Sequence, residues 1–180
     1  SQHGHMATIG YDLYCRMLED TIKIIKGEIS KEPIETTVDI KVDAFISEHY
    51  IEDEIQKIEV YKKIAAIENI DDYNDIEEEL NDRYSKMPES VRNLMDIAYI
   101  KNKAKTVFIE EIKEMPKVII FKFAQGESDY SNIYVNLIKK YKDIVVLKFG
   151  LEPYFAFKIK GIKKENKLEF LKEVVDDIIL

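Results

Sequence analysis

The spacing of apolar residues changes near residue 105, and this change constrains the fold more than any other feature of the sequence. Up to that point, apolar side chains mostly recur every three or four residues, which is typical of helices that bury one face. These segments span about 11–26, 52–68, 73–84 and 88–105, with one alternating, strand-like segment at 37–42. Beyond residue 105, short β-branched and aromatic segments are typical of strands. They lie at 106–109, 118–123, 144–149 and 154–159, and two helical patterns interleave with them at 129–141 and 166–179.

These patterns predict an α+β fold. We expect a helical N-terminal part packed against a small mixed β-sheet of about four to six strands, with further helices. In the helix expected at 52–68, the apolar positions are Ile55, Ile58, Tyr61, Ile64 and Ala65, and in the helix expected at 88–105 they are Val91, Leu94, Met95, Ala98 and Tyr99.

The length of 180 residues suits one domain. The first six residues (SQHGHM) are small, polar and unpatterned, and we interpret them as the remnant of an expression tag. One domain is then expected at 7–180, with a helix-rich part at 7–105 and a sheet-rich part at 106–180.

Charge and cysteine content narrow the class of protein. No stretch of eighteen residues is free of charge, so no membrane-spanning helix is expected, and no segment has the pattern of a signal peptide. The single cysteine, Cys15, cannot form a disulfide within the chain, which is typical of a reducing compartment. It lies among the apolar positions of the first helix, where a buried, unreactive thiol is expected. These features predict a cytoplasmic protein.

Acidic side chains are concentrated in one segment. Residues 48–82 hold thirteen acidic side chains and three lysines, a net charge of −10, so the rest of the chain carries +2 of the total of −8. Such acids either solvate the outer faces of two helices or form a docking surface for a partner that carries arginine or lysine. Both roles can coexist on one helix.

Motifs for catalysis and cofactor binding are missing from the sequence. It has no GxxxxGK[ST] phosphate loop, no GxGxxG, no GxSxG and no HExxH. His49 has no nucleophile beside it and is expected in a loop or in packing. The residues therefore predict a domain that is not an enzyme and holds no metal or cofactor. A metal-dependent enzyme built from the acid cluster is a less favoured alternative, which added magnesium or manganese would stabilise.

The C-terminal half raises a further alternative, an accessory domain that binds DNA. Aromatic rings next to cations are typical of proteins that bind single strands. Arginine is absent from residues 106–180, and acidic residues reduce the positive potential there, so a solvated sheet face with aromatic core residues is favoured. The residues concerned are Lys139, Lys140, Lys142, Lys148, Lys158, Lys160, Lys163 and Lys164, with Tyr134, Tyr141, Phe149 and Tyr154.

Five short motifs occur in order within the first hundred residues. They are IGYDLYCRMLE at 9–19, VDAFI at 42–46 followed by YI at 50–51, YKKIA at 61–65, ELNDRY at 79–84 followed by Pro88, and NLMDIA at 93–98. Together they resemble the IG[FY]DLYxxxLE, strand-and-turn, YKRIA, ELxDRFGxxP and NLLxxA motifs of the C-terminal domain of bacterial transcription-repair coupling factors (Mfd). The resemblance covers about residues 7–110. Tyr84 and Ser85 depart from the family's Phe and Gly, and a glycine there would suit a left-handed helix cap.

The resemblance implies a role in DNA repair. Proteins of this family are large ATP-driven translocases on double-stranded DNA that displace stalled RNA polymerase and recruit UvrA for nucleotide-excision repair. Their last domain lacks the motor, which uses ATP and Mg²⁺. It docks on the UvrB-like module of the same protein and masks the surface that UvrA binds. The resemblance thus implies a non-catalytic, autoinhibitory domain of a cytoplasmic bacterial protein, with the UvrB-like module as its partner.

The resemblance also selects two residues. In the family, the acidic side of this contact comes from the ELxDR helix, which corresponds to Glu79 and Asp82 here. The two carboxylates are three residues apart on one helix face, so they could accept charge-assisted hydrogen bonds from arginines. The alternative is that they cap and solvate their helix, with Asp82 pairing with Lys86 one turn later.

Overall fold

The structure, a computed structural model, describes Cys15 and Leu18 and three longer ranges, 34–125, 129–163 and 167–178. The interpreted tag remnant at 1–6 and most of the helix expected at 11–26 lie outside the described residues. Cys15 is helical and buried, as expected from its place among apolar residues.

The chain divides into two compact units. One comprises Ser1–Pro33 and Val42–Tyr99, and the other comprises Ile34–Lys41 and Ile100–Leu180. This division differs from the one expected at residue 105 in two respects. The short strand near residue 38 belongs with the sheet, and the boundary falls within a helix, after Tyr99.

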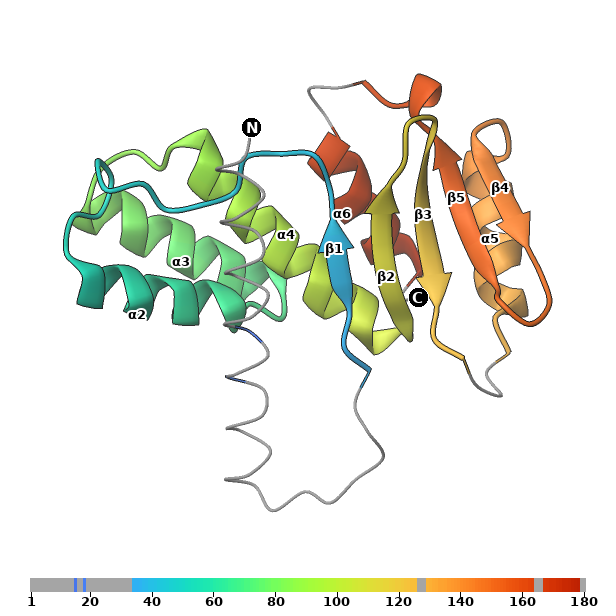
Figure 1. Ribbon diagram of the computed structural model, residues 1–180, viewed down its shortest axis with the longest axis horizontal. Coiled ribbons are helices and arrows are strands. Elements are labelled where there is room, and N and C mark those ends of the chain that lie inside the picture. The colour runs from blue at the N-terminus through green and yellow to red at the C-terminus, as the bar shows by residue number, and fades with distance from the viewer. Residues whose placement is uncertain (1–14, 16–17, 19–33, 126–128, 164–166, 179–180) are drawn as a thin grey trace, which may run out of the picture. The chain divides into compact units, whose positions relative to one another are not determined.

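The described part of the first unit is helical (Figure 1), with α2 (Glu54–Ala65), α3 (Ile70–Arg83) and the first part of α4 (Glu89–Thr106). The side chain of Asp53 caps α2 by accepting a hydrogen bond from the backbone amide of Gln56 at 2.9 Å. Asn69 caps α3 in the same way through the Asp72 amide at 2.9 Å, so α3 begins three residues earlier than expected. The helices expected at 52–68, 73–84 and 88–105 are confirmed.

The core of the first unit lies between these helices and the extended segment before α2. The Phe45 amide donates to the Ser90 carbonyl at 3.2 Å, and the Asn93 side chain donates to the Asp43 carbonyl at 2.9 Å, so this segment is tied to α4. All five apolar positions expected on α4 are buried. The core side chains include Ile46, Val60, Ile64, Ile67, Leu80, Val91, Leu94, Met95 and Ala98.

The second unit is built on a five-stranded mixed sheet in the order β1-β2-β3-β5-β4. Strand β1 is parallel to β2, and the other neighbouring pairs are antiparallel. The strands are β1 (Thr37–Asp39), β2 (Ile109–Glu114), β3 (Val118–Phe123), β4 (Val145–Lys148) and β5 (Tyr154–Lys158). A mixed α+β fold with a sheet of this size was expected and is confirmed.

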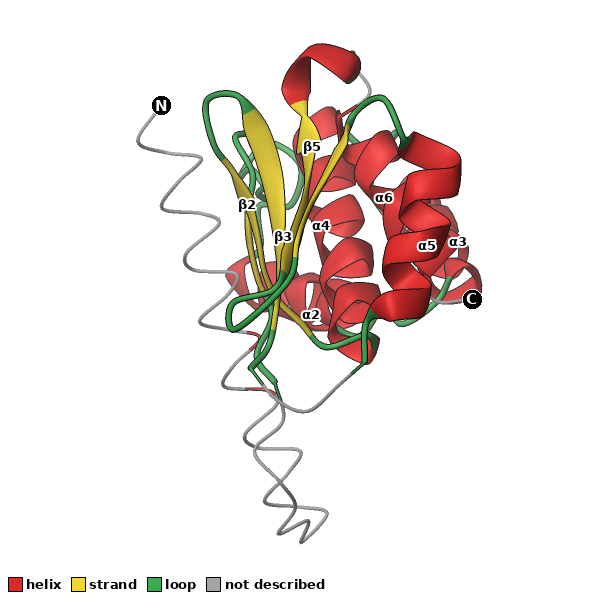
Figure 2. Ribbon diagram, turned by 90° about the vertical axis from the view of Figure 1, so that its right-hand side faces the viewer, coloured by secondary structure: helices red, strands yellow, loops and turns green. Residues whose placement is uncertain are grey.

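Two helices of the second unit, α5 (Ser131–Tyr141) and α6 (Lys167–Ile178), cover one face of the sheet (Figure 2). Four phenylalanines with no exposed surface lie in the core of this unit: Phe121, Phe123, Phe155 and Phe157. At the start of α6, the Lys167 ammonium pairs with the buried Glu114 carboxylate at 2.5 Å and donates to the Lys41 carbonyl at 3.2 Å. This contact fixes the helix to the ends of two strands.

The strand expected at 106–109 is wrong, and the strand that follows it was not expected. Helix α4 continues to Thr106, and Phe108, with a left-handed φ of 61°, turns the chain into β2. The isoleucines of β2, Ile109 and Ile112, are three residues apart, which is a helical spacing. Because the register with β3 shifts between Ile109 and Glu111, both isoleucines nevertheless reach the core.

Candidate docking surface

The end of α3 is held in place by hydrogen bonds from outside the helix. The Tyr50 hydroxyl shares its one hydrogen between the carbonyl oxygens of Leu80 at 3.2 Å and Ser85 at 3.1 Å. The Asn81 side chain accepts the Met87 amide at 2.8 Å and so closes the turn that follows. Ser85 has no left-handed φ, because Phe108 is the one described residue other than glycine in that region. The serine is therefore accommodated without backbone strain.

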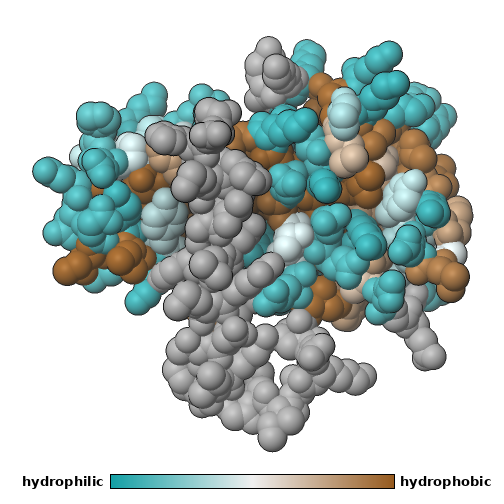
Figure 3. Space-filling view, viewed as in Figure 1, coloured by the Kyte–Doolittle hydropathy of each residue, from teal (hydrophilic) through white to brown (hydrophobic). Residues whose placement is uncertain are grey.

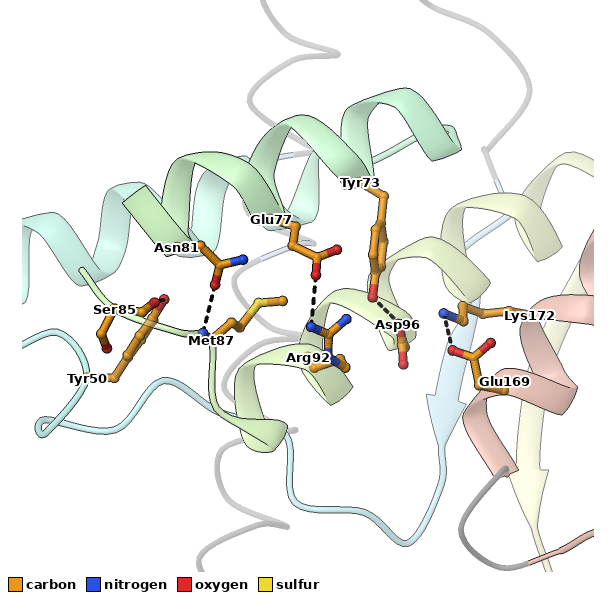
Figure 4. Close-up of polar contacts among 10 residues, drawn as sticks. All are labelled: Tyr50, Tyr73, Glu77, Asn81, Ser85, Met87, Arg92, Asp96, Glu169 and Lys172. Carbon is orange, nitrogen blue, oxygen red and sulfur yellow. Dashed lines mark hydrogen bonds and ion pairs between the residues drawn. The ribbon is translucent and has the colours of Figure 1, made fainter. Parts of the chain in front are cut away.

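Polar side chains join α3 to α4 along the buried side (Figure 4). The Tyr73 hydroxyl donates to the Asp96 carboxylate at 2.6 Å, and both side chains are buried. Burial raises the pKa of Tyr73 above its ordinary value, and the charge of Asp96 raises it further, so this hydroxyl stays protonated. One turn further along, Arg92 donates to Glu77 at 2.8 Å, and this hydrogen bond raises the pKa of Arg92. The helix that carries the candidate residues is thus fixed along its length.

We expect Tyr73→Phe to lower the free energy of unfolding by about 1.5–3 kcal/mol, because it removes a hydrogen bond to a buried carboxylate. Tyr84→Phe is the matched control, because it removes a hydrogen bond to the uncharged Gln56 side chain and should cost about 1 kcal/mol or less. Urea unfolding of both variants at pH 7 measures the difference. Equal losses would contradict a special role for the Tyr73–Asp96 contact.

Glu79 and Asp82 lie on the last two turns of α3, but they differ in their contacts. The Glu79 carboxylate pairs with the Lys63 ammonium of α2 at 2.5 Å and remains 39% exposed. Asp82 is exposed and, within the residues that the structure describes, forms no ion pair. The alternative pairing of Asp82 with Lys86 is absent. Asp82 therefore offers a free carboxylate, whereas the charge of Glu79 is partly compensated.

Asp82 is the last member of an acidic stripe along α3. Asp71, Asp75, Glu78 and Asp82 follow one another at intervals of four, three and four residues, and all are exposed. Residues at these intervals lie on one face of a helix. Acidic charge was expected in this segment, and the structure shows that the stripe faces solvent while Glu77 and Glu79 are turned toward neighbouring helices.

The expectation for α2 needs a correction. Its core residues are Val60 and Ile64, whereas Ile55 and Ile58 are exposed by 71% and 47%. The helix carries apolar residues on two faces, and the sequence pattern alone could not show which face meets α3 and α4. The pairing of Lys63 with Glu79 was also missed, since a contact between two helices leaves no local signal.

The lysine-rich C-terminal half does not form a row of exposed aromatic rings. Tyr134 and Tyr141 are buried, and Phe149 remains 66% exposed. Of the lysines, Lys140 pairs with Glu173 at 3.0 Å and Asp177 at 2.6 Å, and Lys148 lies over the Tyr154 ring at 5.5 Å. These positions favour the interpretation in which the aromatic residues belong to the core and the lysines lie on a solvated face.

The remaining expectations concern His49, metal sites and membrane-spanning helices. His49 lies exposed in a turn. Across the described ranges, no three His, Cys, Asp or Glu side chains come together as possible ligands of a metal ion. None of the helices in the same ranges has the length and hydropathy that crossing a membrane requires.

The model of the TRCF domain family matches residues 40–133, which is just over half of the chain. The chain belongs to the TRCF domain family. The matched segment contains α2, α3, α4 and the two candidate carboxylates, Glu79 and Asp82. Membership in the TRCF family thus rests on the part of the chain that carries the candidate surface.

Curated relatives agree with this assignment to the TRCF family. The transcription-repair-coupling factor of Bacillus subtilis (strain 168) is 38% identical over 114 residues, which is 63% of this chain and 10% of that protein. The same factor from Staphylococcus aureus (strain USA300) is 41% identical over 120 residues, which is 66% of this chain and 10% of the relative. The factor from Borreliella burgdorferi is 28% identical over 170 residues, which is 94% of this chain and 15% of that protein. The chain thus matches only 10–15% of the length of these relatives.

A solved structure supports the fold. The crystal structure of the C-terminal domain of a transcription-repair coupling factor is similar, with a TM-score of 0.70. The match covers 81% of this chain and 92% of that one at 23% sequence identity. At this identity, the likeness shows the TRCF fold and not the function.

Proposed function

We propose that this chain is the regulatory, non-catalytic C-terminal domain of a transcription-repair coupling factor. It docks on the UvrB-like module of the same protein and masks the surface that UvrA binds. The observation that carries the proposal is the free, exposed carboxylate of Asp82 at the fixed end of α3, next to Glu79. An arginine of the partner can reach Asp82 without displacing an internal ion pair, so docking there leaves the fold of this chain intact.

The rest of the proposal concerns the whole protein. The curated relatives are several times longer than this chain, which leaves room for an ATP- and Mg²⁺-dependent motor on double-stranded DNA and for contacts with RNA polymerase. We place these activities in other parts of the protein. We place the whole protein in the bacterial cytoplasm. The surface described here is polar, and polar inter-domain surfaces are readily exchanged for competing contacts. Engagement of polymerase elsewhere on the protein could therefore release the domain.

The two carboxylates should contribute unequally to docking. We expect Asp82→Asn to weaken binding to the isolated UvrB-like module about tenfold, because a free carboxylate then no longer meets an arginine. Glu79→Gln should weaken it less, since Lys63 already compensates part of that charge. Lys63→Gln should strengthen binding, because it frees Glu79 for the partner.

Calorimetric titration of this chain with the UvrB-like module, at low and at high salt, measures all four affinities. Salt-sensitive binding with the order Lys63→Gln, wild type, Glu79→Gln, Asp82→Asn from tightest to weakest supports the proposal. Equal affinities for the wild type and Asp82→Asn would remove Asp82 from the contact. Absence of binding at either salt concentration would contradict docking as a property of this surface.

A further inference from the structure

Two exposed isoleucines lie at the beginning of α2. Ile55 is 71% exposed and Ile58 is 47% exposed, and they are three residues apart, so they share one face of the helix. The core side of α2 is occupied by Val60 and Ile64 instead. Single exposed apolar residues are ordinary on protein surfaces, but an adjacent pair outside the core pattern of its own helix is a feature to explain.

The isoleucine pair lies at the same end of the helix pair as the candidate carboxylates. Two contacts between α2 and α3 fix their relative register: Tyr84 donates to Gln56 at 3.0 Å, and Lys63 pairs with Glu79. The beginning of α2 therefore lies opposite the end of α3. Ile55 precedes Gln56 by one residue, so its level along the helix pair is that of Asp82 and Tyr84. The apolar pair and the free carboxylate thus lie at the same end of the helix pair.

The surroundings of the isoleucine pair are acidic. Asp53 and Glu54 precede it and Glu59 follows it on the same helix, while Lys57 is paired with Glu54 at 3.2 Å. In the hydropathy view, a hydrophobic patch lies over the beginning of α2 with hydrophilic residues around it (Figure 3). This arrangement of an apolar centre and a charged rim is the usual anatomy of a protein–protein contact.

We propose that Ile55 and Ile58 form the apolar centre of the docking surface whose charged part is Asp82 and Glu79. The inference rests on the proposed function and adds the chemistry of the partner. The partner surface carries an exposed aliphatic or aromatic side chain next to its basic residues, because an acidic rim with an apolar centre selects the complementary pattern. Opposite charges then attract the two surfaces to each other, and the burial of the isoleucines away from water stabilises the complex.

The double variant Ile55→Ser with Ile58→Ser tests this inference in the titration against the UvrB-like module. We expect the affinity to fall about 10- to 100-fold at both low and high salt, because the lost contact is apolar and is not screened by salt. By contrast, the loss caused by Asp82→Asn should shrink at high salt. Ile70→Ser is the matched control, since Ile70 is 52% exposed at the opposite end of the helix pair, and it should leave the affinity unchanged.

The possible outcomes separate the two proposals. If the isoleucine variant binds like the wild type while Asp82→Asn binds more weakly, the apolar centre is refuted and the proposed function stands. If Ile70→Ser weakens binding as much as the double variant, the effect is not specific to this end, which also refutes the inference. If the wild type does not bind the module at all, both proposals fail. Unchanged thermal unfolding of the three variants shows that the fold is intact.

Discussion

Phe157→Ala is expected to lower the free energy of unfolding of the second unit by about 3–5 kcal/mol, which is the usual cost of removing a fully buried aromatic ring. The ring has no exposed surface and lies within 5.0–5.8 Å, centroid to centroid, of four others: Phe121, Tyr141, Phe155 and Phe170. These neighbours come from β3, α5, β5 and α6. The resulting cavity therefore cannot be closed by moving one side chain.

Urea unfolding followed by near-ultraviolet circular dichroism measures this loss. Phe149→Ala is the control, because Phe149 is 66% exposed and its removal should cost about 1 kcal/mol or less. A loss below about 1.5 kcal/mol for Phe157→Ala would contradict the rigid aromatic core. It would indicate that the sheet and its two helices collapse into the space.

In the full-length factor, the double variant Glu79→Gln with Asp82→Asn is expected to increase binding of UvrA. If the domain masks the UvrA surface, the masked state is favoured by the free energy of docking. Leaving the partner's arginines without both carboxylates should cost that state about 2–5 kcal/mol. The ratio of open to closed protein then rises about 30-fold or more, until all of the protein is open.

A pull-down of UvrA over a range of concentrations, with and without the double variant, measures the effect. Asp71→Asn with Asp75→Asn is the matched control, because these two acids lie at the other end of the same exposed stripe and change the net charge equally. UvrA binding that rises equally in both variants would indicate a general effect of charge. Binding that rises in neither would contradict the masking role of Glu79 and Asp82.

Sequence reasoning recovered most helices because their signals are local. Caps such as Asp53 and Asn69 act through the amide three residues later, so helix starts can be read within one turn. Strand β2 was not expected, and it shows where local signals are insufficient. Its isoleucines have helical spacing, and the shift in register that makes them both buried depends on β3, which lies elsewhere in the sequence.

The candidate carboxylates were selected by sequence, but their roles were separated by structure. Their spacing placed Glu79 and Asp82 about one turn apart on α3. Only the packing of α2 against α3 brings Lys63 to Glu79 and leaves Asp82 without an ion pair among the described residues. Likewise, only packing decides that Val60 and Ile64 enter the core while Ile55 and Ile58 stay exposed.

The sequence by itself therefore determined the class of fold, the helices within the described ranges, the family and the acidic segment, because periodicity, caps and motifs act over a few residues. The tertiary structure alone decided which acids are free, which isoleucines are exposed and where the register of β2 with β3 shifts by an extra residue. These properties depend on neighbours that are distant in sequence, and a burial or an ion pair exists only once both partners are in place.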